Sequence, residues 1–511
     1  MSETVVVQDQ VFGNFTTTRR VGLGRMSLGA NAVLMLLMLI AATFLFFQLW
    51  IVTLIVAVLG GVGALLMFWK REGRSFYGRF IVKRAFKRRE RLQRTTFVPG
   101  PAGFLPAGAS QLPGLLARTE LIETPDAYGE DSFAILRRSA RGKHLYTVVI
   151  KATPAGIELT DPEKLASQVA HYGAFIAARA QEGIVKGWSV TIESAEDSGV
   201  RVQHMLTSEA RRVEANDWEV PEHSRRVMAH VSDMAASTRA PNTSLRVAIS
   251  FNGGQPGKSE KDRGISEMTE VIRNELPGII SDMQNAGGGT VRACTAQEVI
   301  DETRVAFDPT VAGDVERAQV EGDGTGLSFD QAGPVFAREH FDYYLHDRGC
   351  SRSWTLYDGP RGTFTSMSLR ELTRPESGCL RKRVTLLYRP VPADKTVEVV
   401  ETEQRNAHIV TQQGGRVSAR ALQRKAAADQ SAREEAAGAG VSCFGMIVTV
   451  TTATPEELEP FNSSIPGRVS KMKLPVRIAL GNQAATFQAG LPLGLVLPEH
   501  MHLAPEIREY L

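Results

Sequence analysis

The sequence predicts an α+β fold in which an N-terminal transmembrane helical hairpin is followed by cytoplasmic domains of mixed α/β structure. Three observations predict it: one long stretch lacks charged residues, a dense run of basic residues follows it, and the rest alternates strand-like and helix-like patterns. With 511 residues, 43% hydrophobic and 23% charged, the composition is that of folded protein and excludes wholesale disorder or a collagen-like repeat. A formal net charge of +3 argues against a general nucleic-acid coat.

The uncharged segment, residues 26–69, contains no Asp, Glu, Lys or Arg. It is about twice as long as the ~20 apolar residues that cross a bilayer. One helix of that length would reach about 60 Å, against a hydrocarbon core of roughly 30 Å. We therefore expect a helical hairpin over residues 28–69 that turns at Gln48, beside the interfacial aromatic residues Phe47 and Trp50. A signal peptide would be shorter and would end at a small-residue cleavage site.

The basic collar, residues 70–94, contains eleven basic and two acidic residues. Because basic flanks stay in the cytoplasm, we expect both termini and most of the chain there. Contact with anionic lipids is expected from Lys70, Arg71, Arg74, Arg79, Lys83, Arg84, Lys87, Arg88 and Arg89. The alternative is a nucleic-acid contact, since aromatic side chains that could stack on bases are interleaved, namely Phe76, Tyr77, Phe80 and Phe86. The sequence leaves direct nucleic-acid binding open.

Composition shifts suggest six units. They are a cytoplasmic tail (1–27), the hairpin (28–69), the collar with a Pro/Gly-rich linker (70–114), a first α+β domain (115–306), an acidic linker (307–333) and a second α+β domain (334–511).

In the first domain, alternating apolar residues predict two β-hairpins, with turns near residues 141–142 and 196–199. Helices are expected at 162–181, 222–237, 258–284 and 296–306, and strands at 245–251 and 290–294. In the second domain we expect strands within 351–359, 380–391, 443–453 and 473–480, a helix at 417–437, and a helix that begins at a Thr-x-x-Glu cap at 454–457.

Residues 252–259, Asn-Gly-Gly-Gln-Pro-Gly-Lys-Ser, are similar to a phosphate-binding loop and lie between a predicted strand and a predicted helix. The first Gly of the motif is replaced by Asn252, and no apolar strand ends in the acidic residue that would hold Mg²⁺. A nucleotide-binding enzyme acting through Gly257, Lys258 and Ser259 is therefore the alternative, and an ordinary polar turn is the preferred interpretation.

No other pattern points to catalysis. His340, Asp342, His346, Asp347 and Cys350 are close in sequence but do not have a zinc-site spacing. The cysteines Cys294, Cys350, Cys379 and Cys443 are far apart and are expected to be reduced structural thiols. We predict no enzyme activity, no cofactor and no metal.

The end of the chain carries a longer pattern. Residues 433–461, REEAAGAGVSCFGMIVTVTTATPEELEPF, and 477–500, RIALGNQAATFQAGLPLGLVLPEH, resemble the N-terminal, non-catalytic domain of type IV secretion and conjugation ATPases. That family has a charged Ala-rich helix, a strand of the form f-g-x-x-v-t-v-t and a Q-a-a-x-f-x-x-x-L-P-l-G signature before its motor domain. The signature is matched by Gln483, Ala484, Ala485, Phe487, Leu491, Pro492 and Gly494.

The layout of hairpin, collar and motor-less domain also resembles actinobacterial two-span integral membrane proteins of conjugative loci, and the hairpin resembles the small two-span subunit of conjugation machines. The resemblance implies a chain without an ATPase domain. It further implies a scaffold in the bacterial inner membrane that docks a separate secretion or conjugation ATPase within an assembly with other inner-membrane subunits. Gln483, Phe487, Leu491, Pro492 and Gly494 would be docking residues. A type VII secretion membrane subunit, which also has two N-terminal spans, is the alternative.

Overall fold

The computed structural model describes residues 70–100, 112–125, 132–140, 143–154, 156, 160–237, 241–255, 258–322, 324–359, 369–412, 419–436 and 440–500, with scattered residues between 35 and 58. The predicted tail at 1–27, and all of the predicted hairpin at 28–69 except those scattered residues, lie outside this part of the chain. None of the helices described is both long enough and apolar enough to cross a membrane.

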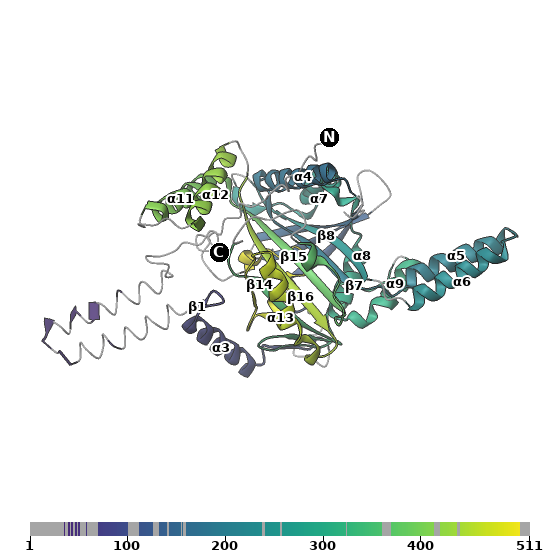
Figure 1. Cartoon of the computed structure of the whole chain (residues 1–511), viewed down its shortest axis with the longest axis horizontal. Coiled ribbons are helices and arrows are strands. Elements are labelled where there is room, and N and C mark those ends of the chain that lie inside the picture. Colours follow the sequence, from purple (N-terminus) through teal and green to yellow (C-terminus); the bar gives the residue numbers. More distant parts are fainter. Residues whose placement is uncertain are drawn as a thin grey trace, which may run out of the picture.

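The protein has a mixed α+β fold built on one antiparallel sheet of 13 strands (Figure 1). In spatial order its main path is β3 (Thr96–Phe97), β12 (Ala337–Glu339), β13 (Tyr344–His346), β14 (Gly349–Leu356), β16 (Ser442–Thr452), β15 (Arg381–Pro390), β7 (Val185–Glu196), β8 (Pro241–Asn252), β6 (Lys143–Thr153), β5 (Ser132–Ala140) and β4 (Thr119–Pro125). Off this path, β11 (Thr290–Ala293) pairs with β6 and β17 (Val476–Ile478) pairs with β14.

The sheet runs through both regions that the sequence separates into domains. Strand β7 of the first region pairs with β15 of the second from Trp188↔Tyr388 to Ala195↔Arg381. The expected linker at 307–333 contains helix α9 (Ala312–Glu321) and two 3-10 turns, η4 (Pro309–Val311) and η5 (Phe329–Ala332). The strands of both regions therefore share one sheet and one continuous core on each of its faces.

One face of the sheet is apolar. Helices α4 (Pro162–Gln181), α7 (Ile265–Met283), α10 (Arg370–Thr373) and α13 (Phe461–Lys471) cover it. Strand residues two apart point to the same face, so alternate apolar residues of each strand gather here. Trp188 stacks on Tyr388 of the neighbouring strand with ring centroids 5.1 Å apart, and Trp354 is fully buried. This face holds the larger hydrophobic cluster.

The opposite face, here called the polar face, carries hydroxyl and charged side chains. It is covered by η2 (Gly114–Leu116), α8 (Ala296–Phe307) and α14 (Gln483–Ala489), with the chain after α14 crossing the same strands. Leu112 and Leu116 are buried here, so the stretch that the sequence assigns to the end of a linker is part of the core. Apolar side chains of the covering elements form the second hydrophobic cluster.

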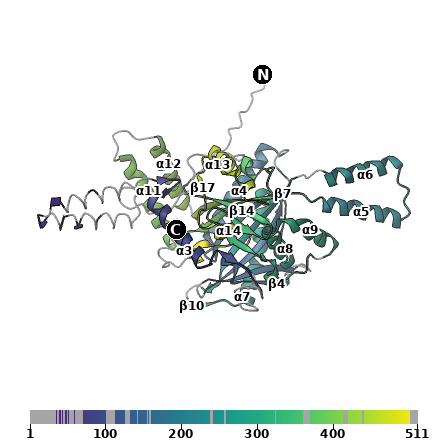
Figure 2. The ribbon, with the colours of Figure 1, turned by 90° about the horizontal axis from the view of Figure 1, so that it is seen from below.

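Two helical hairpins extend from the body. The arm consists of α5 (Val200–Ala215) and α6 (Glu222–Ser237), and it projects on the side of the body opposite to α3 (Phe76–Arg91) in two perpendicular views (Figures 1 and 2). The other hairpin consists of α11 (Ala393–Gln412) and α12 (Ala419–Ala436). The arm is inserted between β7 and β8, which are paired from Val185↔Phe251 as far as Glu196↔Pro241 at its base.

The predicted second β-hairpin, with its turn near 196–199, is wrong: strand β7 is followed by helix α5 of the arm and not by a second strand. Residues 200–208 alternate enough to resemble a strand, but Val202, Leu206 and Val213 recur at i, i+4 and i+11 and form one half-buried face of α5. The predicted helix at 258–284 is also wrong in its first turns. Residues Lys258–Asp262 form strand β10, which pairs with β9 (Gly254–Gln255), and the helix begins at Ile265.

Candidate functional site

Most of the collar forms helix α3, which packs against the body. Before it, β1 (Lys70–Arg71) and β2 (Arg74–Ser75) form a two-stranded hairpin whose turn lies against Tyr357, and Arg477 donates to the carbonyl of Glu72 (3.1 Å). After the helix, β3 joins the edge of the main sheet beside β12. The collar is therefore held at both ends.

The inner face of α3 is formed by Val82, Phe86 and Arg89, at i, i+4 and i+7. Phe86 is buried in edge-to-face contact with Phe341. Arg89 donates to the carbonyl of Gly481 and pairs with Glu339 at 3.2 Å. The other oxygen of Glu339 accepts the N–H of Ala484 (3.3 Å), so the helix is linked to the start of α14.

The structure divides the predicted lipid contacts into three groups. Lys83, Arg84, Lys87 and Arg88 are exposed on the outer face of α3. Arg74 and Arg79 are partly buried, and Arg89 points into the body instead of outward, because Glu339 binds it. Lys70 and Arg71 lie on β1, and their side chains lie outside the described part of the chain.

The C-terminal motif segment, residues 483–496, is buried against the polar face. Gln483 and Phe487 have no exposed surface, Leu491 is 1% exposed, and Pro492 and Gly494 are also buried. Phe487 packs among Phe307, Tyr344 and His346. In this conformation the five predicted docking residues hold the segment to the sheet and leave no surface for a partner.

Hydroxyl groups of the sheet bind the backbone of this segment. Thr385 donates to the carbonyl of Gly490 (2.7 Å) and Ser250 to that of Gly494 (2.7 Å). Arg138, which is fully buried, donates to the carbonyls of Leu493 (3.1 Å) and Gly494 (3.3 Å), and burial lowers its pKa to about 10. Buried polar groups need such partners, so the segment and the polar face stabilise each other.

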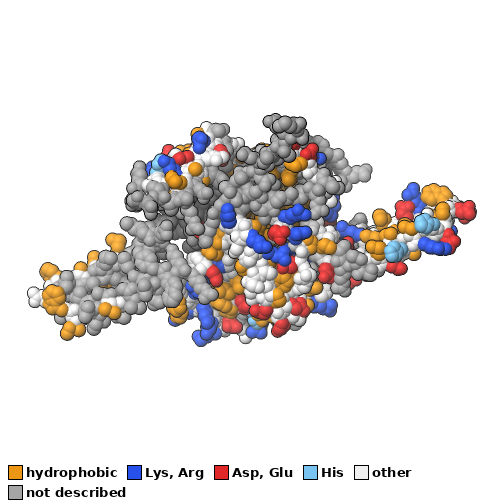
Figure 3. All heavy atoms as spheres, in the orientation of Figure 1, with side chains coloured by type: hydrophobic (Ala, Val, Ile, Leu, Met, Phe, Trp, Pro, Cys, Tyr) orange, Lys and Arg blue, Asp and Glu red, His pale blue; other side chains and the backbone are white. Residues whose placement is uncertain are grey.

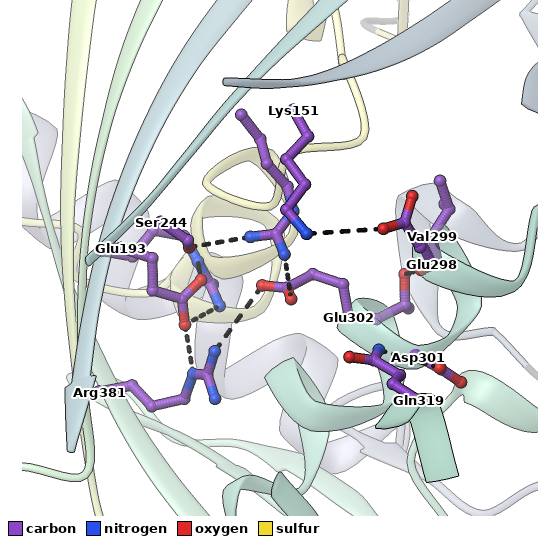
Figure 4. A network of polar contacts seen from close by, with 12 residues as sticks. Lys151, Glu193, Ser244, Glu298, Val299, Asp301, Glu302, Gln319 and Arg381 are labelled. Carbon is purple, nitrogen blue, oxygen red and sulfur yellow. Dashed lines mark hydrogen bonds and ion pairs between the residues drawn. The ribbon is translucent and has the colours of Figure 1, made fainter. Parts of the chain in front are cut away.

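An ion-pair network joins the polar face to α8 (Figure 4). Glu193 on β7 binds Arg381 and Arg383, which lie on the neighbouring strand β15. Burial alone would raise the pKa of Glu193, but the two guanidinium groups hold it well below its usual range. Glu302 on α8 binds Arg246 of β8 (2.7 Å) and approaches Arg381 (3.7 Å).

Glu298, one turn earlier on α8, extends the network. It binds Arg292 of β11 through two hydrogen bonds (2.5 and 2.7 Å) and Lys151 of β6 at 3.5 Å. Burial would raise its pKa, but the bonds from Arg292 and the charge of Lys151 lower it to about 2. Glu193 and Glu298 are thus ionised and paired, which suits a structural clamp and does not suit a general acid or base.

A cavity of about 70 Å³ lies beside this network, at the base of the arm. Its wall includes Arg201 of α5, Gln319 of α9 and Arg381 of the sheet. Asp301 accepts hydrogen bonds from Gln319 (3.0 Å) and from Thr325 (2.6 Å). Side chains of both charges line the cavity, so it has a polar wall between α8, α9 and the sheet.

Lys258 and Ser259 of the phosphate-loop alternative do not lie at the start of a helix. A phosphate-binding loop places its Lys and Ser at the start of a helix, whose first N–H groups face the phosphates. Lys258 and Ser259 instead lie on strand β10, and α7 begins only at Ile265.

The cluster around His346 is also accounted for by packing. Asp342 binds Arg352 (2.6 Å) and Asp347 binds Arg304 (2.8 Å). His346 is fully buried and lies between the carbonyl of Phe307 (2.6 Å) and the hydroxyl of Ser351 (2.7 Å). Its pKa falls to about 4, chiefly through burial, so the ring is neutral. Among the described residues, no group of His, Cys, Asp and Glu side chains is arranged to hold a metal ion.

Sequence reasoning missed two features, the buried polar face and the arm. The polar face has a visible signal, because Ser, Thr, Arg and Glu alternate with apolar residues on β7, β14, β15 and β16. Such alternation normally indicates a solvent-facing side, and only the distant segment that covers it shows otherwise. No protein-family model matches this sequence, and a comparison with curated proteins finds no match.

Proposed function

We propose that this protein is a non-enzymatic, membrane-anchored scaffold of a conjugative type IV secretion machine that docks a cytoplasmic ATPase. One observation carries the scaffold role: α3 lies against one side of a single sheet-built body, the arm projects from the opposite side, and each leaves large apolar side chains exposed. A protein that connects two partners needs two such separated surfaces. The uncharged segment just before α3 supports membrane anchoring, and the resemblance of residues 433–461 and 477–500 supports the link to conjugation.

The arm is the surface we assign to the ATPase. Since the motif segment is buried, its side chains do not meet a partner in this conformation. The arm exposes an apolar set, namely Met205, Trp218, Val227, Met228, Val231 and Met234 (Figure 3). Helices α5 and α6 pack on each other, and α5 also packs against α9, so that their remaining faces stay open. Methionine-rich surfaces adapt well to helical partners. With α3 at the membrane, the arm reaches farthest toward a cytoplasmic motor.

The experiment compares two double variants in conjugation-competent cells. Met228→Asp with Val231→Asp places charges on the apolar stripe of α6, whereas Ala229→Asp with His230→Asp adds the same charges to its polar side. We expect the first variant alone to lose co-purification with the ATPase encoded in the same locus, and to lower DNA transfer at least tenfold. Equal co-purification by both variants would refute arm docking.

The anchor and the absence of activity are tested separately. Cysteine labelling from outside the cell is expected to leave both termini unmodified, and the intact chain is expected in the membrane fraction. A chain found in the soluble fraction would overturn the anchor. ATP hydrolysis by the purified protein that disappears in Lys258→Ala would overturn the non-enzymatic role.

A further inference from the structure

We propose that the outer face of α3 binds the headgroups of anionic phospholipids, with Phe76 and Phe80 inserted among them, so that the helix lies along the membrane surface and fixes the orientation of the body. This inference rests on the proposed membrane anchor and adds the ligand class and the residues that meet it.

The outer face is defined by helical geometry. At about 100° per residue, positions 76, 80, 83, 84, 87 and 88 fall within an arc of about 140° on α3. Val82 and Arg89 lie on the opposite side, where they contact the body. Phe76 and Phe80 are 54% and 55% exposed, which is unusual for aromatic side chains in contact with water alone. The exposed face is thus aromatic in its first half and basic in its second half.

The charge on this face is not compensated within the described part of the chain. Lys83, Arg84, Lys87 and Arg88 are exposed, and no ion pair joins them to a described acidic side chain. Lys and Arg side chains gather over the position of α3 in the space-filling view (Figure 3). Four cations without a described acidic partner, beside two exposed aromatic rings, match an anionic membrane surface, where phosphates meet the cations and the rings enter the interfacial layer.

The membrane explains this face better than a nucleic acid does. Phe76 follows the uncharged segment by seven residues, which keeps α3 close to any bilayer that this segment enters. Stacking on bases requires open rings along the basic surface, but Phe86, the aromatic residue among the cations, is buried against Phe341. The rings that remain exposed are those nearest the uncharged segment.

The contact orients the body because α3 does not move independently. Its entry turn lies against Tyr357, and its last turns are held by Phe341, Glu339 and the carbonyl of Gly481. Because this helix is fixed to the body at both ends, its orientation on the membrane surface also sets the orientation of the sheet. The arm, on the opposite side of the body, then points away from the bilayer.

The test uses the full chain in nanodiscs. A fluorophore is attached at Phe80→Cys in a Cys443→Ser background, because the other three cysteines are buried. Nitroxide-labelled lipids report its depth, with Met228→Cys on the arm as the control position. We expect quenching at position 80 in phosphatidylglycerol, at least three-fold weaker quenching in phosphatidylcholine, and none at position 228.

Charge reversal supplies the matched variant. The combined variant Lys83→Glu, Arg84→Glu, Lys87→Glu and Arg88→Glu is expected to abolish the dependence on phosphatidylglycerol. The control reverses four charges on the arm (Arg211→Glu, Arg212→Glu, Arg225→Glu and Arg226→Glu) and is expected to leave this dependence unchanged. Lack of quenching at position 80 in a protein that stays in the nanodisc would refute this inference and leave the anchor intact. A protein that fails to enter the nanodisc would instead refute the proposed function. Binding of an oligonucleotide that the α3 reversal abolishes, without lipid quenching, would assign the face to nucleic acid.

Discussion

Gln483 completes the hydrogen bonding of strand β14 at Ser353. The N–H of Ser353 donates to Oε1 of Gln483 at 2.8 Å, and Nε2 of Gln483 donates to the carbonyl of Ser353 at 3.3 Å. On this edge of β14, strand β13 pairs only as far as Ser351 and β17 pairs only from Trp354. The side-chain amide therefore fills the gap between two short strands and attaches the motif segment to the sheet.

Replacing Gln483 with Leu is expected to lower the free energy of unfolding by about 1–3 kcal/mol, because the buried N–H of Ser353 loses its partner, whereas the carbonyl of Ser353 keeps the N–H of Ala479 (3.0 Å). Denaturant titration of the purified protein measures the change. Gln203→Leu, at an exposed position on α5, serves as the control and is expected to stay within about 0.5 kcal/mol of the wild type. Equal effects of the two changes would contradict the role assigned to Gln483.

Gly494 has a positive φ of 64°, and a Cβ atom there would lie 2.5 Å from Cγ2 of Thr147 and 2.7 Å from the hydroxyl of Ser250. Gly494→Ala is therefore expected to destabilise the protein by about 2–4 kcal/mol, through backbone strain and overpacking. Gly467 lies within α13 with open space around its Cα, so Gly467→Ala is expected to stabilise by about 0.5–1 kcal/mol. Thermal unfolding midpoints should move in opposite directions for the two variants.

Removing the charge of Glu193 leaves two buried guanidinium groups without their shared carboxylate. Glu193→Gln is expected to cost about 3–5 kcal/mol, the usual effect of breaking a buried ion pair from one side. Limited proteolysis should show faster cleavage of the variant. The same change at Glu209, whose pair with Arg212 is exposed, is expected to leave the cleavage rate unchanged.

Stability is expected to fall as the pH drops from about 6.5 toward 4, partly because of His346. Burial lowers its pKa from 6.5 to about 4, so over this range the unfolded chain binds a proton that the folded chain does not. His346→Gln should reduce the slope of unfolding free energy against pH by up to about 1.4 kcal/mol per unit. A wild-type slope in the His346 variant would contradict this assignment.

The cysteines are expected to differ in reactivity. Cys294, Cys350 and Cys379 are buried, and burial raises their thiol pKa values to about 11, 12 and 11. Cys443 is half-exposed. Mass spectrometry after brief maleimide treatment of the native protein should therefore find the label on Cys443, and denatured protein should carry four labels.

Helical periodicity predicted individual elements well. The helices at 162–181 and 222–237 begin and end where the apolar pattern places them, and the helix at 296–306 extends by one residue to Phe307. Alternation failed at residues 200–208, where a short stretch fits both a strand and the first turns of a helix. Only the packing of α5 against α6 distinguishes the two.

The composition of the sequence predicted that residues 70–94 form a basic surface, but not which of their side chains face outward. The density of Lys and Arg at 70–94 predicted a basic surface, and exposed Lys83, Arg84, Lys87 and Arg88 agree with it. No local pattern indicates that Arg89 faces inward, because its partner Glu339 lies 250 positions later in the sequence. The motif segment is a second example. Its signature can be recognised in the sequence, but its burial cannot, because the hydroxyl groups that bind it come from strands far apart in the chain.

The attachment of the arm has a mechanical consequence. Because α5 follows β7 and α6 precedes β8 in the chain, a pull on the tip reaches the sheet through two strands that are paired from Val185↔Phe251 to Glu196↔Pro241. Such a load stretches many backbone hydrogen bonds in parallel instead of breaking them one after another. A motor that pushes or pulls on this lever would therefore tilt the body as a unit before it unravelled the strands.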